Sequence, residues 1–513
     1  MTQGQIFMTV SIVLYIVSVI VVGLWYARKN KNTDDFYIGG RRLGPYVTAM
    51  SAEATDMSAW LLMGLPGTAY FFGTAEAFWT AVGLAAGTYL AWLIEAKRLR
   101  RYSQAVDAIT IPDFFANRFH DKSKLLLLIS SVTIIVFFVP YTSSGFNASG
   151  KLFASLFGVD YRVAMLISAV VIVFYTALGG FLAESVTDVI QGVIMSFSLG
   201  FVFIYGVVHA GGFGNVIENA SKLPGYLSVS ASYVWETGGS QPYTVIAAIC
   251  LLAWGLGYFG MPHFILRFMA IEDENKIKVA RRVASIWVVL SMGVAILIGV
   301  TGFSLSKDGM IGTLNTYSDA ETIIVIISNF LSQNGIIAAL LAGLVIAGIL
   351  ASTMSTSDSQ LLVASSAIAQ NVLQGVFGVK LTEKQSMLAA RLTVIGIAVV
   401  SAVEAWEPAS VFSIVSFAWA GFGAAFGPVM LCGLFWRRTN RTGALAGMIS
   451  GGAMVFIWKY LVRPLGGAWN VYELLPAFLF GLAVIIVVSL LTEKPSAEME
   501  REFDYAAGKV NLN

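Results

Sequence analysis

Two apolar stretches of this 513-residue sequence are interrupted in the middle by glycine, proline and polar residues. The first reads Ser51-Ala-Glu-Ala-Thr-Asp-Met-Ser-Ala-Trp-Leu-Leu-Met-Gly-Leu-Pro-Gly67, with the carboxylate of Asp56 inside it. The second runs from Leu252 to His263 and holds three glycines and one proline. Interrupted helices at corresponding places in two halves of a membrane protein indicate the substrate and ion site of a secondary transporter.

Asp56 is the first candidate for ion chemistry. A carboxylate at the centre of a bilayer costs about 2.5–3.5 kcal/mol on insertion scales, so it normally faces a polar cavity or a cation. Backbone carbonyls freed near Ala54, Met57 and Ser58 would suit Na⁺, a hard cation that prefers oxygen. The alternative is a structural Asp that caps the second half of the helix. The surrounding Gly and Pro residues favour the ion site, and the two roles are compatible.

A stripe of hydroxyl groups lies in the apolar stretch 336–370. Ser352, Ser355, Thr356 and Ser359 follow the spacing i, i+3, i+4, i+7, which puts them on one helix face. Such a stripe suits a partly desolvated sodium ion, but small residues also pack membrane helices together. The spacing alone does not choose between these readings, and the presence of Asp56 elsewhere favours the ion.

Two further acids, Asp188 and Asp358, lie in apolar segments. Together with Ser355 and Ser359 they suggest a second cation site. A hydrogen-bonded structural pair is the alternative.

Aromatic residues accompany the interruptions. Trp254 and Tyr258 are four residues apart on the second broken segment, and Tyr141 follows Pro140 in a third polar interruption. Aromatic pairs at this spacing usually serve packing. Beside a helix break they would instead wall a small apolar ring and donate hydrogen bonds to it.

Composition identifies a membrane protein. Only 12% of residues are charged and mean hydropathy is +0.76, whereas soluble domains carry about 25% charged residues. The net charge of +2 gives no support to a nucleic-acid partner. The sequence lacks a phosphate-binding Gly-rich loop, zinc-ligand spacing and a nucleophile elbow, so we expect no enzyme activity and a process driven by an ion gradient.

A helix needs about 20 apolar residues to cross a bilayer. The sequence offers thirteen such segments and therefore predicts an all-α polytopic membrane protein. We place the short apolar stretch 320–333 in an interfacial helix. The predicted spans are 5–27, 45–71, 74–96, 124–148, 162–182, 187–210, 243–263, 281–304, 336–370, 388–406, 409–435, 442–464 and 472–492.

The distribution of basic residues predicts the orientation. With the N-terminus outside, the cytoplasmic segments are 28–44, 97–123, 183–186, 264–282, 371–391, 436–441 and the tail. Only six of the 32 Lys and Arg residues then face outward: Lys151, Arg162, Lys222, Lys307, Lys459 and Arg463. This positive-inside asymmetry supports an odd number of spans, an outer N-terminus and a cytoplasmic C-terminus.

Each broken segment opens a run of five spans. Because five is odd, the second run enters the membrane from the opposite side, which predicts two inverted five-helix repeats with broken first and sixth core helices. The expected organisation is 1–44 (first span and cytoplasmic loop), 45–210 (first repeat), 211–242 (outer loop), 243–441 (second repeat), 442–492 (two additional spans) and 493–513 (cytoplasmic tail).

At these residues the chain resembles the sodium/solute symporter family, and within it the proline branch. The resemblance extends from the first span to about Arg441, and the joint occurrence of its motifs is highly specific. Besides the stretch Asp56–Gly67, the motifs are Asp35-Phe-Tyr-Ile-Gly-Gly-Arg-Arg-Leu-Gly44, Ile111-Pro-Asp-Phe-Phe-Ala-Asn-Arg118, Tyr175-Thr-Ala-Leu-Gly-Gly-Phe-Leu182, the segment from Trp254 to Arg267 and Met354-Ser-Thr356.

The resemblance implies one Na⁺ held between the broken first core helix and the eighth. The implied ligands are backbone atoms of Ala54 and Met57, the residue at Ser352, and the side chains of Ser355 and Thr356, with Asp56 important for Na⁺ affinity. The implied proline site is Ser58, Trp60, Tyr141, Trp254, Tyr258 and Pro262.

Three positions depart from the resembled pattern. Ala59 replaces a Gly that is usual in the proline branch, and Ser352 replaces a common Ala. Members with two sodium sites pair an acid at Asp188 with hydroxyls near Asp358 and Ser359, but here position 358 is itself acidic. The number of sodium ions therefore stays open.

These observations together predict Na⁺-coupled uptake of L-proline by alternating access across a plasma membrane of bacterial type. We expect Na⁺, L-proline and membrane lipid as partners, with no obligate protein partner. The same architecture would also serve pantothenate, a sugar, sialic acid or another amino acid. A membrane solute sensor is a further alternative, which the short polar tail disfavours.

Overall fold

The computed structural model describes residues 2–28 and 33–510 of the chain. Apart from a two-stranded antiparallel hairpin, regular structure in these residues is helical. The elements are α1 (Gln3–Ala27), α2 (Thr33–Ile38), α3 (Pro45–Asp56), α4 (Leu65–Phe72), α5 (Thr74–Leu90), α6 (Ala96–Ala105), α7 (Ile111–Arg118), α8 (Leu125–Phe157), α9 (Tyr161–Gly179), α10 (Phe181–His209), α11 (Phe213–Ser221), β1 (Ala231–Val234), β2 (Gly239–Pro242), α12 (Val245–Leu252), α13 (Pro262–Ala270), α14 (Ile277–Lys307), α15 (Tyr317–Ala320), α16 (Ile323–Ser332), α17 (Ile336–Ser366), α18 (Glu383–Glu404), α19 (Val411–Phe435), α20 (Arg441–Ile457), α21 (Leu474–Leu491) and α22 (Ala497–Ala506).

The predicted all-α membrane fold is confirmed, although the count of thirteen spans is not. Among the described residues, ten helices are long and apolar enough to cross a bilayer, and the bent pair α12–α13 makes an eleventh if it is counted as one span. The predicted spans 45–71 and 162–182 fall on α3–α4 and α9. The first of these is interrupted, and the second coincides with the helix Tyr161–Gly179.

Both predicted interruptions are real breaks in helices. Helix α3 ends at Asp56, and Met57 leaves helical geometry with ψ at 57° before a π-helical turn, Trp60–Gly64, leads into α4. Helix α12 continues into a 3-10 segment, Ala253–Phe259, and α13 restarts at Pro262. The axes of the second pair differ by 44°. Proline suits the first turn of a helix because its missing N–H would have no partner there, which explains the restart.

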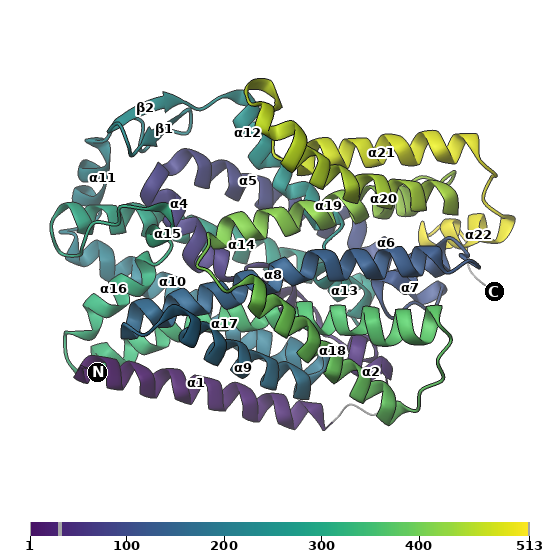
Figure 1. Ribbon diagram of the computed structural model, residues 1–513, viewed down its shortest axis with the longest axis horizontal. Coiled ribbons are helices and arrows are strands. Elements are labelled where there is room, and N and C mark those ends of the chain that lie inside the picture. The colour runs from purple at the N-terminus through teal and green to yellow at the C-terminus, as the bar shows by residue number, and fades with distance from the viewer. Residues whose placement is uncertain (1, 29–32, 511–513) are drawn as a thin grey trace.

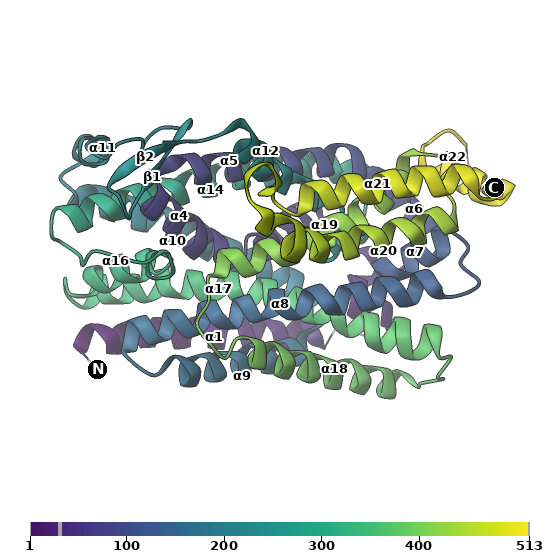
Figure 2. The ribbon, with the colours of Figure 1, turned by 45° about the horizontal axis from the view of Figure 1, so that its top comes forward.

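The broken helices lie in the interior of the helix bundle. Helix α3 packs against α10, α13, α14 and α17, while α1 lies along α17 and α10. Helices α20 and α21 form a layer on α19 (Figures 1 and 2). Helix α1 begins at one end of the long axis and α22 lies at the other (Figure 1).

Glycines allow the second broken segment to approach its neighbours closely. A Cβ added at Gly87 of α5 would lie 2.3 Å from the Cα of Gly255, and one added at Gly257 would lie 2.0 Å from Nε1 of Trp419. Since real Cβ atoms do not approach other heavy atoms so closely, these glycines set the distance between α5, the 3-10 segment and α19.

Three predicted segments differ from the structure. The expected cytoplasmic loop 183–186 is helical, since the chain turns at Gly180, whose φ of 88° favours glycine, and α10 begins at Phe181. The expected loop 264–282 starts with seven buried residues of α13. The polar tail contains the helix α22, which packs on α6.

Candidate functional site

The end of α3 and the middle of α17 meet through hydroxyl groups. The hydroxyl of Ser355 donates to the carbonyl oxygen of Ala54 at 2.8 Å, and that of Thr356 donates to the carbonyl oxygen of Thr55 at 2.7 Å. Both hydroxyls also lie within reach of the carbonyl oxygen of Ser352, at 3.2 and 3.1 Å. The structure therefore groups hydroxyl and carbonyl oxygens from two helices about 300 residues apart in sequence, a donor set that suits Na⁺.

Not all predicted sodium ligands take part in the same way. The hydroxyl of Ser352 donates to Ile349 of its own helix at 2.7 Å, so its backbone carbonyl, rather than its side chain, faces this group of oxygens. Met57 is the C-cap residue of α3, and its N–H donates to the backbone carbonyl oxygen of Glu53. Thr55, which was not predicted, contributes a carbonyl beside that of Ala54.

Asp56 connects the two broken helices. Its Oδ2 accepts a hydrogen bond from the hydroxyl of Tyr258, while its Oδ1 has no hydrogen-bond partner among the described residues. The side chain is almost fully buried. Its backbone carbonyl accepts from Nε1 of Trp60 at 3.4 Å. A buried, partly unpartnered carboxylate next to the carbonyl ends of α3 is arranged to attract a cation.

Predicted substrate residues form an aromatic cluster beside this carboxylate. Trp60 and Trp254 have ring centroids 6.4 Å apart. Trp254 also stacks on Tyr472 at 5.5 Å, and its carbonyl accepts from Nε1 of Trp419 at 2.7 Å. The ring of Tyr258 meets Trp419 edge-on at 5.0 Å. All of these side chains are buried in this conformation.

The remaining predicted substrate residues border the same region. Tyr141 of α8 is buried, and its hydroxyl has no hydrogen-bond partner within the described part of the chain. Ser58 lies in the break after α3, where its hydroxyl accepts from the N–H of Trp60 at 3.5 Å. Pro262 begins α13. The structure thus brings together aromatic and polar side chains from α8 and both broken helices.

The predicted second cation group is only partly assembled. Asp188 and Ser359 both contact Arg267, at 3.5 Å and 2.7 Å respectively. Asp358 instead accepts a hydrogen bond from Thr176 of α9, and its Oδ2 has no partner among the described residues. Arg267 and its ion-pair partner Glu184 had no role in the sequence prediction.

A charged residue inside a membrane segment is a functional candidate by default. This signal was missed at Arg267 because the span was predicted to end at His263. His263 was also missed. It is fully buried, its ring centroid lies 6.0 Å from that of Tyr141, and neither ring nitrogen has a hydrogen-bond partner in the described ranges.

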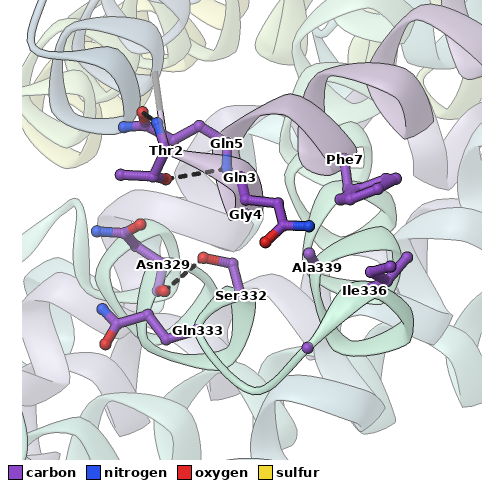
Figure 3. Close-up of a pocket in the computed structure, with 11 residues that line it drawn as sticks. Thr2, Gln3, Gly4, Gln5, Phe7, Asn329, Ser332, Gln333, Ile336 and Ala339 are labelled. Atoms are coloured by element: carbon purple, nitrogen blue, oxygen red, sulfur yellow. Dashed lines mark hydrogen bonds between the residues drawn. The ribbon is translucent and has the colours of Figure 1, made fainter.

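A surface cavity of about 380 Å³ lies at the N-terminal end of α1, between it and the α16–α17 turn (Figure 3). Thr2, Gln5 and Phe7 line it on one side, and Asn329 and Ser332 line it on the other. None of the predicted site residues lines this cavity, so it is separate from the candidate site.

The fold resembles that of solved transporters. A Na⁺-coupled sialic acid symporter, solved in a substrate-bound outward-open state, matches with a TM-score of 0.77 at 17% identity, covering 96% of this chain and 99% of that one. The nucleobase-cation-symport-1 family transporter MHP1 matches with a TM-score of 0.51 at 14% identity, covering 93% and 99%. These likenesses show a shared fold.

Sequence relatives are much more similar. The osmoregulated proline transporter OpuE of Bacillus subtilis is 40% identical over 96% of both chains. A sodium/proline symporter of Staphylococcus aureus is 38% identical over 96% of this chain and 94% of its own length. The profile of the sodium:solute symporter family matches residues 36–451. The chain therefore belongs to the sodium:solute symporter family.

Proposed function

We propose that this chain is a secondary transporter that couples inward Na⁺ movement to uptake of L-proline. The names of full-length relatives at 38–40% identity support proline as the solute and Na⁺ as the coupling ion. The single observation that carries the proposal is the pair of hydrogen bonds from Ser355 and Thr356 to the carbonyl oxygens of the two residues that precede Asp56 in α3.

Sodium binding would organise the break after α3. In this proposal the hydroxyls of Ser355 and Thr356 turn their lone pairs toward Na⁺ and release the carbonyls of Ala54 and Thr55, which become ligands themselves. The Ser352 carbonyl completes the group from the α17 side. The negative charge of Asp56 stabilises the ion without needing direct contact.

Proline would bind between the two breaks. Its ring packs against Trp254 and Tyr258, while its carboxylate meets polar groups at the break around Ser58. The Tyr258–Asp56 hydrogen bond joins the solute region to the ion region. Because a ligand shifts a conformational equilibrium only by its differential affinity, both Na⁺ and proline must favour the same state before closure.

The Tyr258 side chain offers a direct test of the solute region. We expect Tyr258→Ala to weaken proline affinity at least tenfold, since truncating an aromatic anchor of a binding site commonly costs about 2 kcal/mol or more, above the roughly 1.4 kcal/mol of a tenfold change. The Na⁺ concentration for half-maximal uptake should change much less. Uptake at varied proline and saturating Na⁺ measures the effect, and Tyr258→Phe, which keeps the ring, is the control. A variant with normal proline affinity would remove Tyr258 from the solute site.

The membrane placement follows from the same proposal. We place the chain in the plasma membrane with its N-terminus outside and its C-terminus in the cytoplasm, because basic residues cluster on the predicted inner segments. The two five-helix repeats would span 45–210 and 243–441. Accessibility of single cysteines introduced near Gln3 and Lys509 to an impermeant thiol reagent in intact cells tests this orientation.

Uptake into proteoliposomes tests the function. We expect labelled proline to accumulate with an inward Na⁺ gradient and not with an equal K⁺ gradient. Unlabelled pantothenate, a sugar, sialic acid and other amino acids should compete poorly. Uptake that is indifferent to Na⁺ contradicts the coupling, while strong competition by another solute changes the substrate. Tight binding with negligible turnover would instead indicate a sensor.

A further inference from the structure

Trp419 of α19 contacts both aromatic side chains that the second broken helix contributes to the proposed solute site. Its indole Nε1 donates a hydrogen bond to the backbone carbonyl oxygen of Trp254 at 2.7 Å. Its ring is inclined by 27° to that of Trp254, with centroids 6.3 Å apart, and meets the ring of Tyr258 edge-on at 5.0 Å. All three side chains are buried, with at most 2% of their surface exposed. The sequence prediction gave Trp419 no role.

A glycine allows the indole to lie directly against the 3-10 segment. Gly257 lies between Trp254 and Tyr258 in sequence, and a Cβ added there would lie between 2.0 and 2.6 Å from three atoms of the Trp419 indole. One turn along α19, a Cβ added at Gly423 would lie 2.9 Å from the Cα of Gly257. Trp419 therefore sets the distance between α19 and the segment that carries the two rings.

Each of the two rings also contacts the first broken helix. The ring centroid of Trp254 lies 6.4 Å from that of Trp60, and the hydroxyl of Tyr258 donates to Asp56. Both rings thus link α19 to the break after α3, where the proposed solute site lies. Because buried side chains are close-packed and relax into a volume that a neighbour vacates, a smaller residue at position 419 should change the position of both rings.

We propose that Trp419 is a positioning residue that sets the width of the solute site and thereby selects the five-membered ring of proline over larger and smaller cyclic secondary amino acids. The inference rests on the proposed proline-transport function. An apolar pocket discriminates one methylene group by roughly tenfold or more. Such discrimination requires walls that do not recede, and the hydrogen bond and ring contacts of Trp419 hold Trp254 and Tyr258 in place.

Competition by ligands of different ring size tests the inference on the wild-type protein. Na⁺-driven uptake of labelled proline into proteoliposomes is measured against unlabelled proline, azetidine-2-carboxylate with a four-membered ring, and pipecolate with a six-membered ring. We expect pipecolate to inhibit at least about tenfold less well than proline, and azetidine-2-carboxylate to inhibit less well than proline too. Equal inhibition by proline and pipecolate would show that the site does not distinguish ring size and would overturn the inference.

Substitutions at position 419 test its role. Trp419→Leu removes most of the indole, so the ratio of the pipecolate to the proline inhibition constant should fall about tenfold, while azetidine-2-carboxylate should lose further against proline. Trp419→Phe keeps a ring but loses the N–H, and should change both ratios in the same directions by about threefold, as expected for one lost hydrogen bond. The Na⁺ concentration for half-maximal uptake should stay within about threefold of wild type, a shift no larger than one lost hydrogen bond produces, because the bonds between α17 and α3 do not involve Trp419.

Trp92→Phe is the matched control. Trp92 is also buried, its Nε1 donates to Glu53 at 3.1 Å, and its ring contacts Phe268 of α13 with centroids 4.5 Å apart. The control removes an indole N–H from another buried position and should leave the ring-size ratios unchanged. Equal weakening of all three ligands in the Trp419 variants, with wild-type ratios, would indicate a purely structural role and contradict the inference.

A double variant covers the case in which Trp419→Leu does not reach the membrane. Gly257→Ala combined with Trp419→Leu places a methyl group in the vacated volume, so membrane abundance should recover and the ring-size ratios should return toward wild type. No recovery in the double variant would contradict the direct contact on which the inference depends. Proline uptake that does not depend on Na⁺ would instead overturn the proposed function itself.

Discussion

Replacing both Ser355 and Thr356, as Ser355→Ala with Thr356→Val, should abolish stimulation of proline uptake by Na⁺ in the accessible concentration range. Each single change should raise the Na⁺ concentration for half-maximal uptake about tenfold, because one ligand to the ion is lost at roughly 1.4 kcal/mol. The side-chain volumes are nearly unchanged, so packing between α17 and α3 should survive. Uptake at saturating proline and varied Na⁺ measures the effect.

Ser352 supplies a control on the same helix face. Its hydroxyl bonds to Ile349 within α17, and only its carbonyl faces the proposed ion. Ser352→Ala should therefore leave the Na⁺ requirement within about twofold of wild type, a shift expected for the loss of one local hydrogen bond. Thr356→Ser keeps the hydroxyl and should also remain close to wild type. Wild-type Na⁺ dependence in the double variant would exclude these hydroxyls as ligands.

Asp56→Asn should raise the Na⁺ concentration for half-maximal uptake by about tenfold to a hundredfold. At an effective dielectric constant near 20, two unit charges 4 Å apart interact by about 4 kcal/mol, so a carboxylate somewhat farther from the ion still contributes the roughly 1.4–2.7 kcal/mol that corresponds to this range. The Asn side chain keeps an oxygen that can accept from the Tyr258 hydroxyl, so the link between the broken helices should persist. Proline affinity at saturating Na⁺ should change less than the Na⁺ requirement.

Glu53 is the matched control for Asp56. It lies one turn earlier on α3 and is equally buried, but its Oε1 accepts from Thr88 of α5 at 3.0 Å and from Trp92 at 3.1 Å. Glu53→Gln removes the same charge from a group directed toward other partners, and its effect on Na⁺ should be clearly smaller. Equal effects of the two substitutions would indicate that any negative charge on α3 increases Na⁺ affinity, and that Asp56 has no special position beside the ion.

Much of the fold was predictable because bilayer thickness fixes the length of apolar segments. The predicted span 409–435 closely matches α19, Val411–Phe435, and the predicted 336–370 contains all of α17. The two helix breaks were predictable because Gly, Pro and Asp occur together where an unbroken helix would exclude them. The hydroxyl stripe was predictable because helical periodicity puts those residues on one face, and α3 indeed lies against it.

The cluster around Arg267 could not be predicted in the same way. Its partners Glu184 and Ser359 are 83 and 92 residues away in sequence, and no periodicity relates them. The hydropathy pattern also placed Arg267 in a cytoplasmic loop, because charged residues lower the mean hydropathy of a segment and the predicted span ended at His263. In the structure this charge is compensated by its partners, which allows α13 to continue in the interior to Ala270. The local sequence shows that a charge is costly to bury, but it does not show which distant side chains will pair with that charge.

The most direct test of the central claim is the linkage between the two ligands in purified protein. Proline binding should tighten at least tenfold when Na⁺ replaces K⁺, and Na⁺ binding should tighten by the same factor when proline is present, because coupling free energies are reciprocal. The Ser355→Ala, Thr356→Val double variant should bind proline with the weak affinity of the sodium-free wild type, whether or not Na⁺ is present. Sodium-dependent proline binding that persists unchanged in this variant would contradict a site shared between α3 and α17.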